Sequence, residues 1–177
     1  NREYIKNLSS EEFWDYANPW IPNKFKDSPM LPMLPKLESI IRDRIEKFSD
    51  IKTLFEGTSP EFAEGEMSYF FEKPKVDEKM LAWLNRSGKS DRPISEADLG
   101  KEIEKAHEYL KQIKILLESL ETWDYESIKG AIWDYASSEG RGAVLWPMRV
   151  ALSGREKSPD PFEIASILGK EETLKRL

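Results

Sequence analysis

Apolar residues recur at steps of three and four along most of this chain, which is the spacing of one face of an α-helix. One such run begins at Lys36, and a longer one follows Ser95 and extends to about Leu120. No stretch sustains the two-residue alternation of a half-buried strand. The pattern predicts an all-α chain. The apolar positions of these two runs are Leu37, Ile40, Ile41, Ile45 and Phe48, then Leu99, Ile103, Ala106, Leu110, Ile113, Leu116 and Leu117.

Residues that begin and end helices stand at the boundaries of these runs. Ser9 and Glu12 have the spacing of a capping box, and Asp160-Pro161 reads as an N-cap followed by proline at the first helical position. Gly154 follows an apolar patch, as the residue after a helix often does. Further caps are predicted at Ser49, Asp77, Ser95 and Asp124, and further helix ends at Gly57, Gly140 and Gly169.

Between these helices the pattern is less regular. Residues 1–8 are predicted as a short lead-in, and the proline-rich stretch 20–35 as an irregular but packed connection. Pro60 is predicted to open a helix that ends in the aromatic cluster 69–71. The polar stretch 85–93 is predicted as a surface loop.

The chain has 177 residues, enough for one sizeable domain or two small ones with a real core. No apolar run approaches the roughly 20 residues of a membrane span, so no membrane contact is expected. Cysteine is absent, which excludes disulfides and thiolate sites and is compatible with the cytoplasm. The sequence begins at Asn1 with neither Met nor the apolar core of a signal peptide, and it is therefore expected to be a fragment or a processed product.

The net charge of −6 weighs against a general nucleic-acid coat protein, since bulk phosphate binding needs a broad basic face. A local contact with RNA remains compatible with this charge, because residues 141–157 contain four basic side chains and one acidic one. Catalysis has little support. His107, the only histidine, is predicted near the polar face of the long helix, and no glycine-rich phosphate loop occurs. A free-standing small enzyme therefore lacks a plausible site.

Two arginines remain as candidates for recognition. Arg44 lies at the edge of an apolar stripe, where it is either an arginine whose stem packs and whose head reaches water or a donor fork directed by a packed helix. Arg149 precedes the stiff turn 158–161, which leads into a helix N-terminus. Such a terminus offers N–H groups to an anion or a base edge, and an adjacent arginine can bond a base or a phosphate. Alternatively, Arg149 pairs with a local acid and the turn only packs.

The C-terminal segment resembles the end of bacterial glutamyl-tRNA synthetases. Trp146-Pro147-Met148-Arg149-Val150-Ala151-Leu152-Ser153-Gly154 is similar to the family pattern Pro-Leu-Arg-x-Ala-Leu-Thr-Gly, and Leu168-Gly169-Lys170-Glu171 is similar to its Leu-Gly-Lys-Glu. Upstream, Arg44-Ile-Glu-Lys-Phe-Ser-Asp-Ile51 resembles the helix Arg-x-x-Thr-Leu-x-Glu of the same family. The resemblance implies the α-helical cage type of anticodon-binding region, with two packed helical subdomains. Residues 1–75 would follow the catalytic core and residues 76–177 would form the C-terminal anticodon-binding subdomain. Composition alone would instead place the boundary at the 85–93 loop.

The resemblance also implies which residues contact RNA. Arg44 would contact the third anticodon base and favour the cytosine of the glutamate anticodon over the guanine of the glutamine anticodon. Arg149 and the turn residues would contact the first two bases. The sequence departs from its relatives at Asp160-Pro161, where Pro161 has no N–H to donate and Asp160 adds negative charge. The turn residues are Ser158, Pro159, Asp160 and Pro161.

The nucleotide-binding signatures of the parent synthetase, His-x-Gly-His and Lys-x-Ser-Lys, do not occur in this sequence. The resemblance therefore implies no catalytic site and no cofactor in this chain, with ATP and Mg²⁺ bound in the parent's catalytic core. The expected partners are the anticodon loop of tRNA(Glu) and the catalytic domain of the same polypeptide, in a monomeric cytoplasmic protein. The alternative is a helical protein-interaction module without RNA binding.

Overall fold

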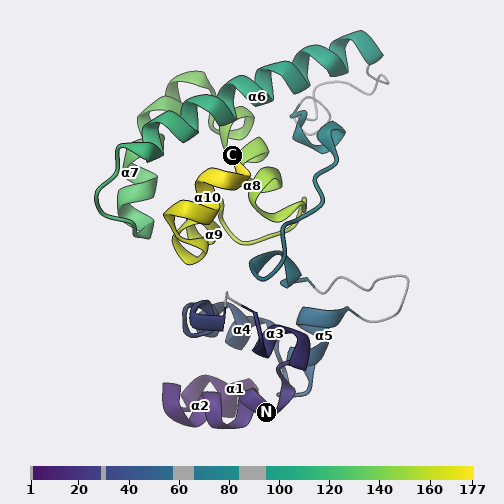
Figure 1. The fold of residues 1–177 in the computed structure, drawn as a ribbon, viewed down its shortest axis with the longest axis vertical. Helices are drawn as coiled ribbons and strands as arrows, with labels where there is room; N and C mark the ends of the chain where they lie inside the picture. The colour runs from purple at the N-terminus through teal and green to yellow at the C-terminus, as the bar shows by residue number, and fades with distance from the viewer. Residues whose placement is uncertain (1, 29–30, 58–65, 84–94) are drawn as a thin grey trace. The chain divides into compact units, whose positions relative to one another are not determined.

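The computed structural model describes residues 2–28, 31–57, 66–83 and 95–177. Their regular secondary structure is helical throughout, which confirms the predicted all-α class, and it contains no strand within these ranges. The chain forms two compact units, Asn1–Lys73 and Pro74–Leu177 (Figure 1). The boundary predicted from the sequence, between residues 75 and 76, lies two residues C-terminal to the boundary in the structure. The predicted start at Pro60 and the predicted loop 85–93 lie outside the described residues.

The first unit is built from short helices. A helix occupies residues that the sequence pattern gave only as a lead-in, and it buries Ile5. The capping box at Ser9 and Glu12 is confirmed, because each residue's backbone N–H bonds to the other's side chain. The elements are α1 (Arg2–Asn7), α2 (Ser10–Ala17), η1 (Asn18–Trp20), α3 (Asn23–Lys26), η2 (Leu31–Leu37), α4 (Glu38–Arg44), α5 (Asp50–Glu56) and η3 (Ser68–Phe70), where η marks a 3₁₀ helix.

The helix predicted from Lys36 to Phe48 is shorter than its apolar pattern. α4 ends at Arg44, and Ile45 is extended but still fully buried. The carboxylate of Asp50 accepts the N–H groups of Glu46 and Lys47 at 3.0 and 3.1 Å, which gives these donors a partner outside a helix. The chain therefore turns before α5. Ser49 stands at the start of α5 as predicted, but its side chain makes no capping bond.

The second unit is organised around α8 (Arg141–Ser153), which packs against α6, α7 and α9. Apart from its first residue, α8 carries a single charged side chain, Arg149, and most of its other side chains are buried. An apolar helix of this kind becomes a central element because it can bury surface on several sides at once. The other elements are η4 (Glu78–Leu81), α6 (Glu96–Glu118), α7 (Tyr125–Glu139), α9 (Pro161–Leu168) and α10 (Lys170–Arg176).

Local capping chemistry in this unit follows the sequence. The side chains of Asp77, Ser95, Asp124 and Asp160 each accept a backbone N–H at the start of a helix. Gly154 ends α8 in the left-handed conformation, with φ +66°, that glycine adopts without a Cβ clash. The predicted helix after Asp77 is only a single 3₁₀ turn. These caps fix where α8 ends and α9 begins, and so they fix the turn between them.

Candidate functional site

Arg149 lies in the last turns of α8 and is partly exposed. Its Nη1 donates to the carbonyl oxygen of Ser158 over 3.4 Å, a long and weak bond. Within the part of the chain that the structure describes, no carboxylate pairs with Arg149, so the alternative of a local ion pair is not what the structure contains. A guanidinium has five N–H donors. Most of those on Arg149 therefore remain available to a ligand.

The end of α8 is held firmly below this arginine. The hydroxyl of Ser153, which is buried, donates to the carbonyl of Arg149 over 2.7 Å and accepts the N–H of Arg155 over 3.1 Å. The backbone that carries Arg149 is thus tied both to its own helix and to the chain that leaves it. A rigid base lowers the entropy lost when a long side chain binds.

The turn 158–161 faces Arg149 but offers RNA fewer groups than the sequence suggested. The carboxylate of Asp160 accepts the N–H of Phe162 over 2.8 Å, so it serves as the N-cap of α9. Pro161 is buried and has no N–H. Ser158 and Pro159 are partly exposed, and the hydroxyl of Ser158 lies 3.0 Å from the Pro159 carbonyl. The structure brings Ser158 into contact with Arg149. Pro159 and Asp160 follow Ser158 in the turn, whereas Pro161 is buried at the start of α9.

Arg44 lies in the other unit, at the end of α4. Its Nη1 donates to the carbonyl of Ile40 over 3.3 Å, and its Nε lies 3.7 Å from the carboxylate of Glu66. The side chains of Arg44 and Glu66 are 27% and 55% exposed, so the ion pair is weak and solvated. Arg44 is partly exposed, and its guanidinium already has a partner in Glu66. A ligand at Arg44 would compete with Glu66.

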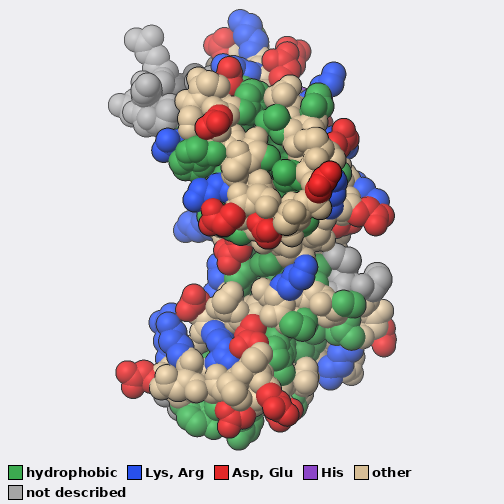
Figure 2. All heavy atoms as spheres, turned by 90° about the vertical axis from the view of Figure 1, so that its left-hand side faces the viewer, with side chains coloured by type: hydrophobic (Ala, Val, Ile, Leu, Met, Phe, Trp, Pro, Cys, Tyr) green, Lys and Arg blue, Asp and Glu red, His purple; other side chains and the backbone are tan. Residues whose placement is uncertain are grey.

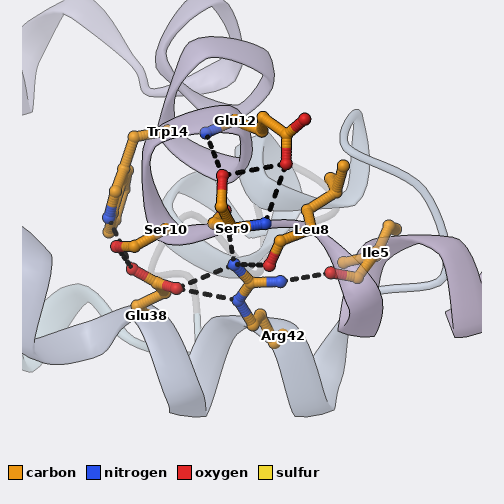
Figure 3. A network of polar contacts seen from close by, with 8 residues as sticks. All are labelled: Ile5, Leu8, Ser9, Ser10, Glu12, Trp14, Glu38 and Arg42. Atoms are coloured by element: carbon orange, nitrogen blue, oxygen red, sulfur yellow. Dashed lines mark hydrogen bonds and ion pairs between the residues drawn. The ribbon is translucent and has the colours of Figure 1, made fainter.

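The helix that carries Arg44 is anchored by a polar cluster around Arg42, which sequence reasoning missed (Figure 3). Arg42 donates to Glu38 at 2.9 Å, to the carbonyls of Leu8 and Ser9 at 3.1 Å each, and to the carbonyl of Ile5. Its guanidinium also lies 4.2 Å from the centre of the Phe13 ring. Arg42 therefore joins α4 to the chain between α1 and α2. In the sequence, the i,i+4 spacing of Glu38 and Arg42 indicates their ion pair. It does not indicate the bonds from Arg42 to the carbonyls of the preceding segment.

Glu38 completes this cluster. Its carboxylate accepts the indole N–H of Trp14 at 2.9 Å and the hydroxyl of Ser10, in addition to Arg42. Partial burial raises the pKa of Glu38, but the bonds from Ser10, Arg42 and Trp14 outweigh burial and hold that pKa below its usual value of 4.5. Glu38 is thus charged at neutral pH, and the cluster is a structural support for α4.

Little in the described residues resembles a catalytic centre. His107 is exposed on α6. The described ranges contain no group of three or more His, Cys, Asp or Glu side chains placed to hold a metal ion. In the same residues, no helix has the length and apolar character needed to cross a bilayer. On the face drawn in Figure 2, basic and acidic side chains are interspersed, which matches local recognition better than bulk phosphate binding.

The fold and the site define a class: a helical region of two units, in which an arginine with available donors lies beside a capped helix start. The chain belongs to the family of anticodon binding domains, whose family model matches residues 12–177. It is similar to the glutamate–tRNA ligases of Clostridium acetobutylicum, with 31% identity over 180 residues, and of Clostridium novyi, with 32% identity over 181 residues. These alignments cover 100% of this chain and 32% of each relative, so the chain spans about a third of their length.

A solved structure shares the fold. The crystal structure of a glutamate tRNA ligase from Elizabethkingia meningosepticum in complex with its amino acid matches 99% of this chain and 30% of its own, with a TM-score of 0.60 and 22% identity. The resemblance to glutamyl-tRNA synthetases is therefore confirmed for the family and for the helical architecture.

Proposed function

We propose that this chain is the anticodon-binding region of a glutamate–tRNA ligase and that it helps to select tRNA(Glu) by its anticodon. The observation that carries the proposal is Arg149, whose guanidinium makes one long bond to Ser158 and has no acidic partner among the described residues. Sequence-specific RNA recognition uses unstacked loop bases, which an arginine can bond or stack upon. An arginine held on a rigid helix beside a turn fits that task.

In this proposal, Arg149 with Ser158, Pro159 and Asp160 contacts the first two anticodon bases. Pro161 keeps only a packing role, since it is buried and lacks a donor. Arg44 contacts the third base after releasing Glu66, and it favours cytosine over guanine. A bidentate arginine contact discriminates between bases by roughly 1–3 kcal/mol, on values from DNA.

The remaining activity belongs to the parent protein. ATP and Mg²⁺ would act in a catalytic domain of the same cytoplasmic, monomeric polypeptide. This chain would position the tRNA for that domain.

The dependence of RNA binding on salt tests this function against the protein-interaction alternative. The measurement is the association constant of the 177-residue chain for a glutamate-anticodon stem-loop, at several salt concentrations. Each phosphate neutralised on a single strand contributes a slope of about −0.7 to log K against log salt. Two or three contacts should give a slope between about −1.4 and about −2.1. Absence of binding at the lowest salt would instead support a module that does not bind RNA.

A further inference from the structure

The segment 74–83 of the second unit lies along α8 and runs in the opposite direction (Figure 1). Its start contacts the C-terminal end of α8 at Gly154, its middle contacts Trp146, and its end contacts Gly142 near the N-terminal end. We call this segment the strap. The strap therefore crosses almost the whole length of the helix that carries Arg149.

Two glycines allow this close approach. A Cβ atom on Gly142 would lie 2.4 Å from Cζ2 and 2.7 Å from Cε2 of the Trp83 indole. A Cβ on Gly154 would lie 2.9 Å from the carbonyl oxygen of Lys75. By contrast, a Cβ on Gly100 or Gly130, in α6 and α7, would meet no atom within 4 Å. Gly142 and Gly154 thus mark positions at which the strap leaves no room for a side chain on the opposing backbone.

Tryptophans complete the contact between strap and helix. The indole N–H of Trp146 donates to the carbonyl of Met80 over 2.7 Å. The rings of Trp83 and Trp146 lie 5.7 Å apart, a distance typical of aromatic pairs in contact. Trp83 therefore touches both Gly142 and Trp146, which are one helical turn apart.

Arg149 lies on the same face of α8 as these contacts. Gly142, Trp146 and Arg149 follow one another at i, i+4 and i+7, which places them on one stripe of a helix. The strap fills that stripe at Gly142 and Trp146. A rotation or axial shift of α8 would break the Trp83 and Met80 contacts, and it would move the guanidinium of Arg149 by a similar amount.

We propose that Trp83 is a positioning residue for the recognition site: by seating on Gly142 and Trp146, it fixes the rotation and height of α8 and so fixes where Arg149 reaches. The proposal rests on the function proposed above, because it assigns Arg149 to base recognition. Trp83 itself touches no ligand. Its effect is expected on selectivity at the bases that Arg149 reads, with the base read by Arg44 unaffected.

The test compares Trp83→Ala and Gly142→Ala with Gly130→Ala, a glycine replacement in an open position. Each 177-residue chain is titrated with three stem-loops: one with the glutamate anticodon, one changed at the first base and one changed at the third. Trp83→Ala and Gly142→Ala should reduce first-base discrimination by roughly tenfold, the size of one base contact. Third-base discrimination should stay within about twofold, and Gly130→Ala should behave as wild type.

Two further measurements separate positioning from support of the fold. The side-chain N–H resonance of Arg149 should shift in the Trp83→Ala chain without RNA and should return toward its wild-type position in Trp83→Phe. The double variant Trp83→Ala with Gly142→Ala should lose no more selectivity than the worse single variant, since both act through one contact. If Trp83→Ala unfolds the chain, first-base and third-base discrimination are compared in Gly142→Ala and Trp83→Phe instead.

The failures are distinguishable. If the wild type discriminates at the first base and folded Trp83→Ala or Gly142→Ala discriminates equally well, Trp83 does not position Arg149. Equal loss at the first and third bases would also overturn the proposal, because it would indicate general destabilisation. A wild-type chain that binds none of the stem-loops overturns the proposed function instead. In that case the Arg149 resonance, measured without RNA, is the remaining test of whether Trp83 positions Arg149.

Discussion

The guanidinium of Arg149 and the main-chain carbonyl of Ser158 lie 3.4 Å apart, across the junction between the end of α8 and the turn into α9. The bond is long and weak, and it leaves most of the guanidinium donors unused. A ligand beside the turn could bond to these donors. The pair is the centre of the proposed recognition of the first two anticodon bases.

Arg149→Gln should reduce discrimination at those bases by about 1–3 kcal/mol, because glutamine cannot reproduce the guanidinium fork. Binding isotherms with stem-loops changed at the first or second base measure this loss. Lys157→Gln is the matched control, since it removes one positive charge from an exposed position nearby. It should weaken binding to all stem-loops to a similar, small extent. Equal selectivity in both variants would show that Arg149 acts only through its charge.

Asp160 should separate stability from RNA affinity. Asp160→Ala removes the N-cap of α9 and should lower the free energy of unfolding by about 1 kcal/mol. Asp160→Asn keeps a capping oxygen and should stay within a few tenths of a kcal/mol of wild type. The asparagine variant also removes a negative charge from the proposed RNA site, so its affinity for the stem-loop should rise. Thermal unfolding and RNA titration test the two effects, and a weaker complex with Asp160→Asn would mean that the carboxylate itself makes a favourable contact.

Arg44 and Glu66 should have opposite effects on third-base preference. Arg44→Gln should abolish the preference for cytosine over guanine at that base. Glu66→Gln removes the 3.7 Å ion pair, which would compete with RNA at the proposed site, and it should strengthen binding of the cytosine-containing stem-loop. The gain should be below about 1 kcal/mol, the usual value of an exposed ion pair. Competition between the two stem-loops measures both changes. An unchanged preference in Arg44→Gln would remove Arg44 from the site.

The cluster around Arg42 should make the stability of the first unit depend on pH. The pKa of Glu38 is lower in the folded protein than its usual value of 4.5, so its contribution is complete above that value and is lost as the pH falls through the folded pKa. The free energy of unfolding by urea should therefore fall as the pH is lowered below about 5. Glu38→Gln should flatten this part of the profile. A profile identical to wild type would exclude Glu38 as the cause.

Arg42→Ala should destabilise the same unit at neutral pH by about 3 kcal/mol, since it leaves Glu38 and several carbonyls without a donor. Lys6→Ala removes an exposed ion pair to Asp43 and serves as the control. Its effect should lie within about 0.5 kcal/mol. Urea denaturation followed by tryptophan fluorescence compares the two variants. Similar effects would mean that the Arg42 cluster contributes little to the fold.

What the sequence predicted well was local. The caps at Ser9, Asp124 and Asp160 and the left-handed Gly154 depend on residues within a few positions of one another, and each is present in the structure. The position of Arg149 before a capped helix start followed from the same signals. The sequence did not predict that Arg149 lacks an acidic partner among the described residues, since an ion pair depends on which side chains the fold brings near.

What the sequence could not predict was contact between distant segments. Trp83 lies against Gly142, and Arg42 bonds the carbonyls of residues more than thirty positions earlier. Neither contact leaves a periodic pattern. The early end of α4 is a further example: the apolar spacing continues to Phe48, but the Asp50 carboxylate binds the N–H groups that would have continued the helix. Pro161 likewise matched a site by position, whereas its burial is a property of packing.

Whether this chain recognises an anticodon can be measured by the binding of two stem-loops that differ only at the third anticodon base. One carries the glutamate anticodon with cytosine, and the other carries the glutamine anticodon with guanine. The 177-residue chain should bind the glutamate stem-loop more tightly, by about tenfold for one arginine contact. Arg44→Gln should remove the difference. Equal affinity of the wild-type chain for both stem-loops would show that it does not select the glutamate anticodon.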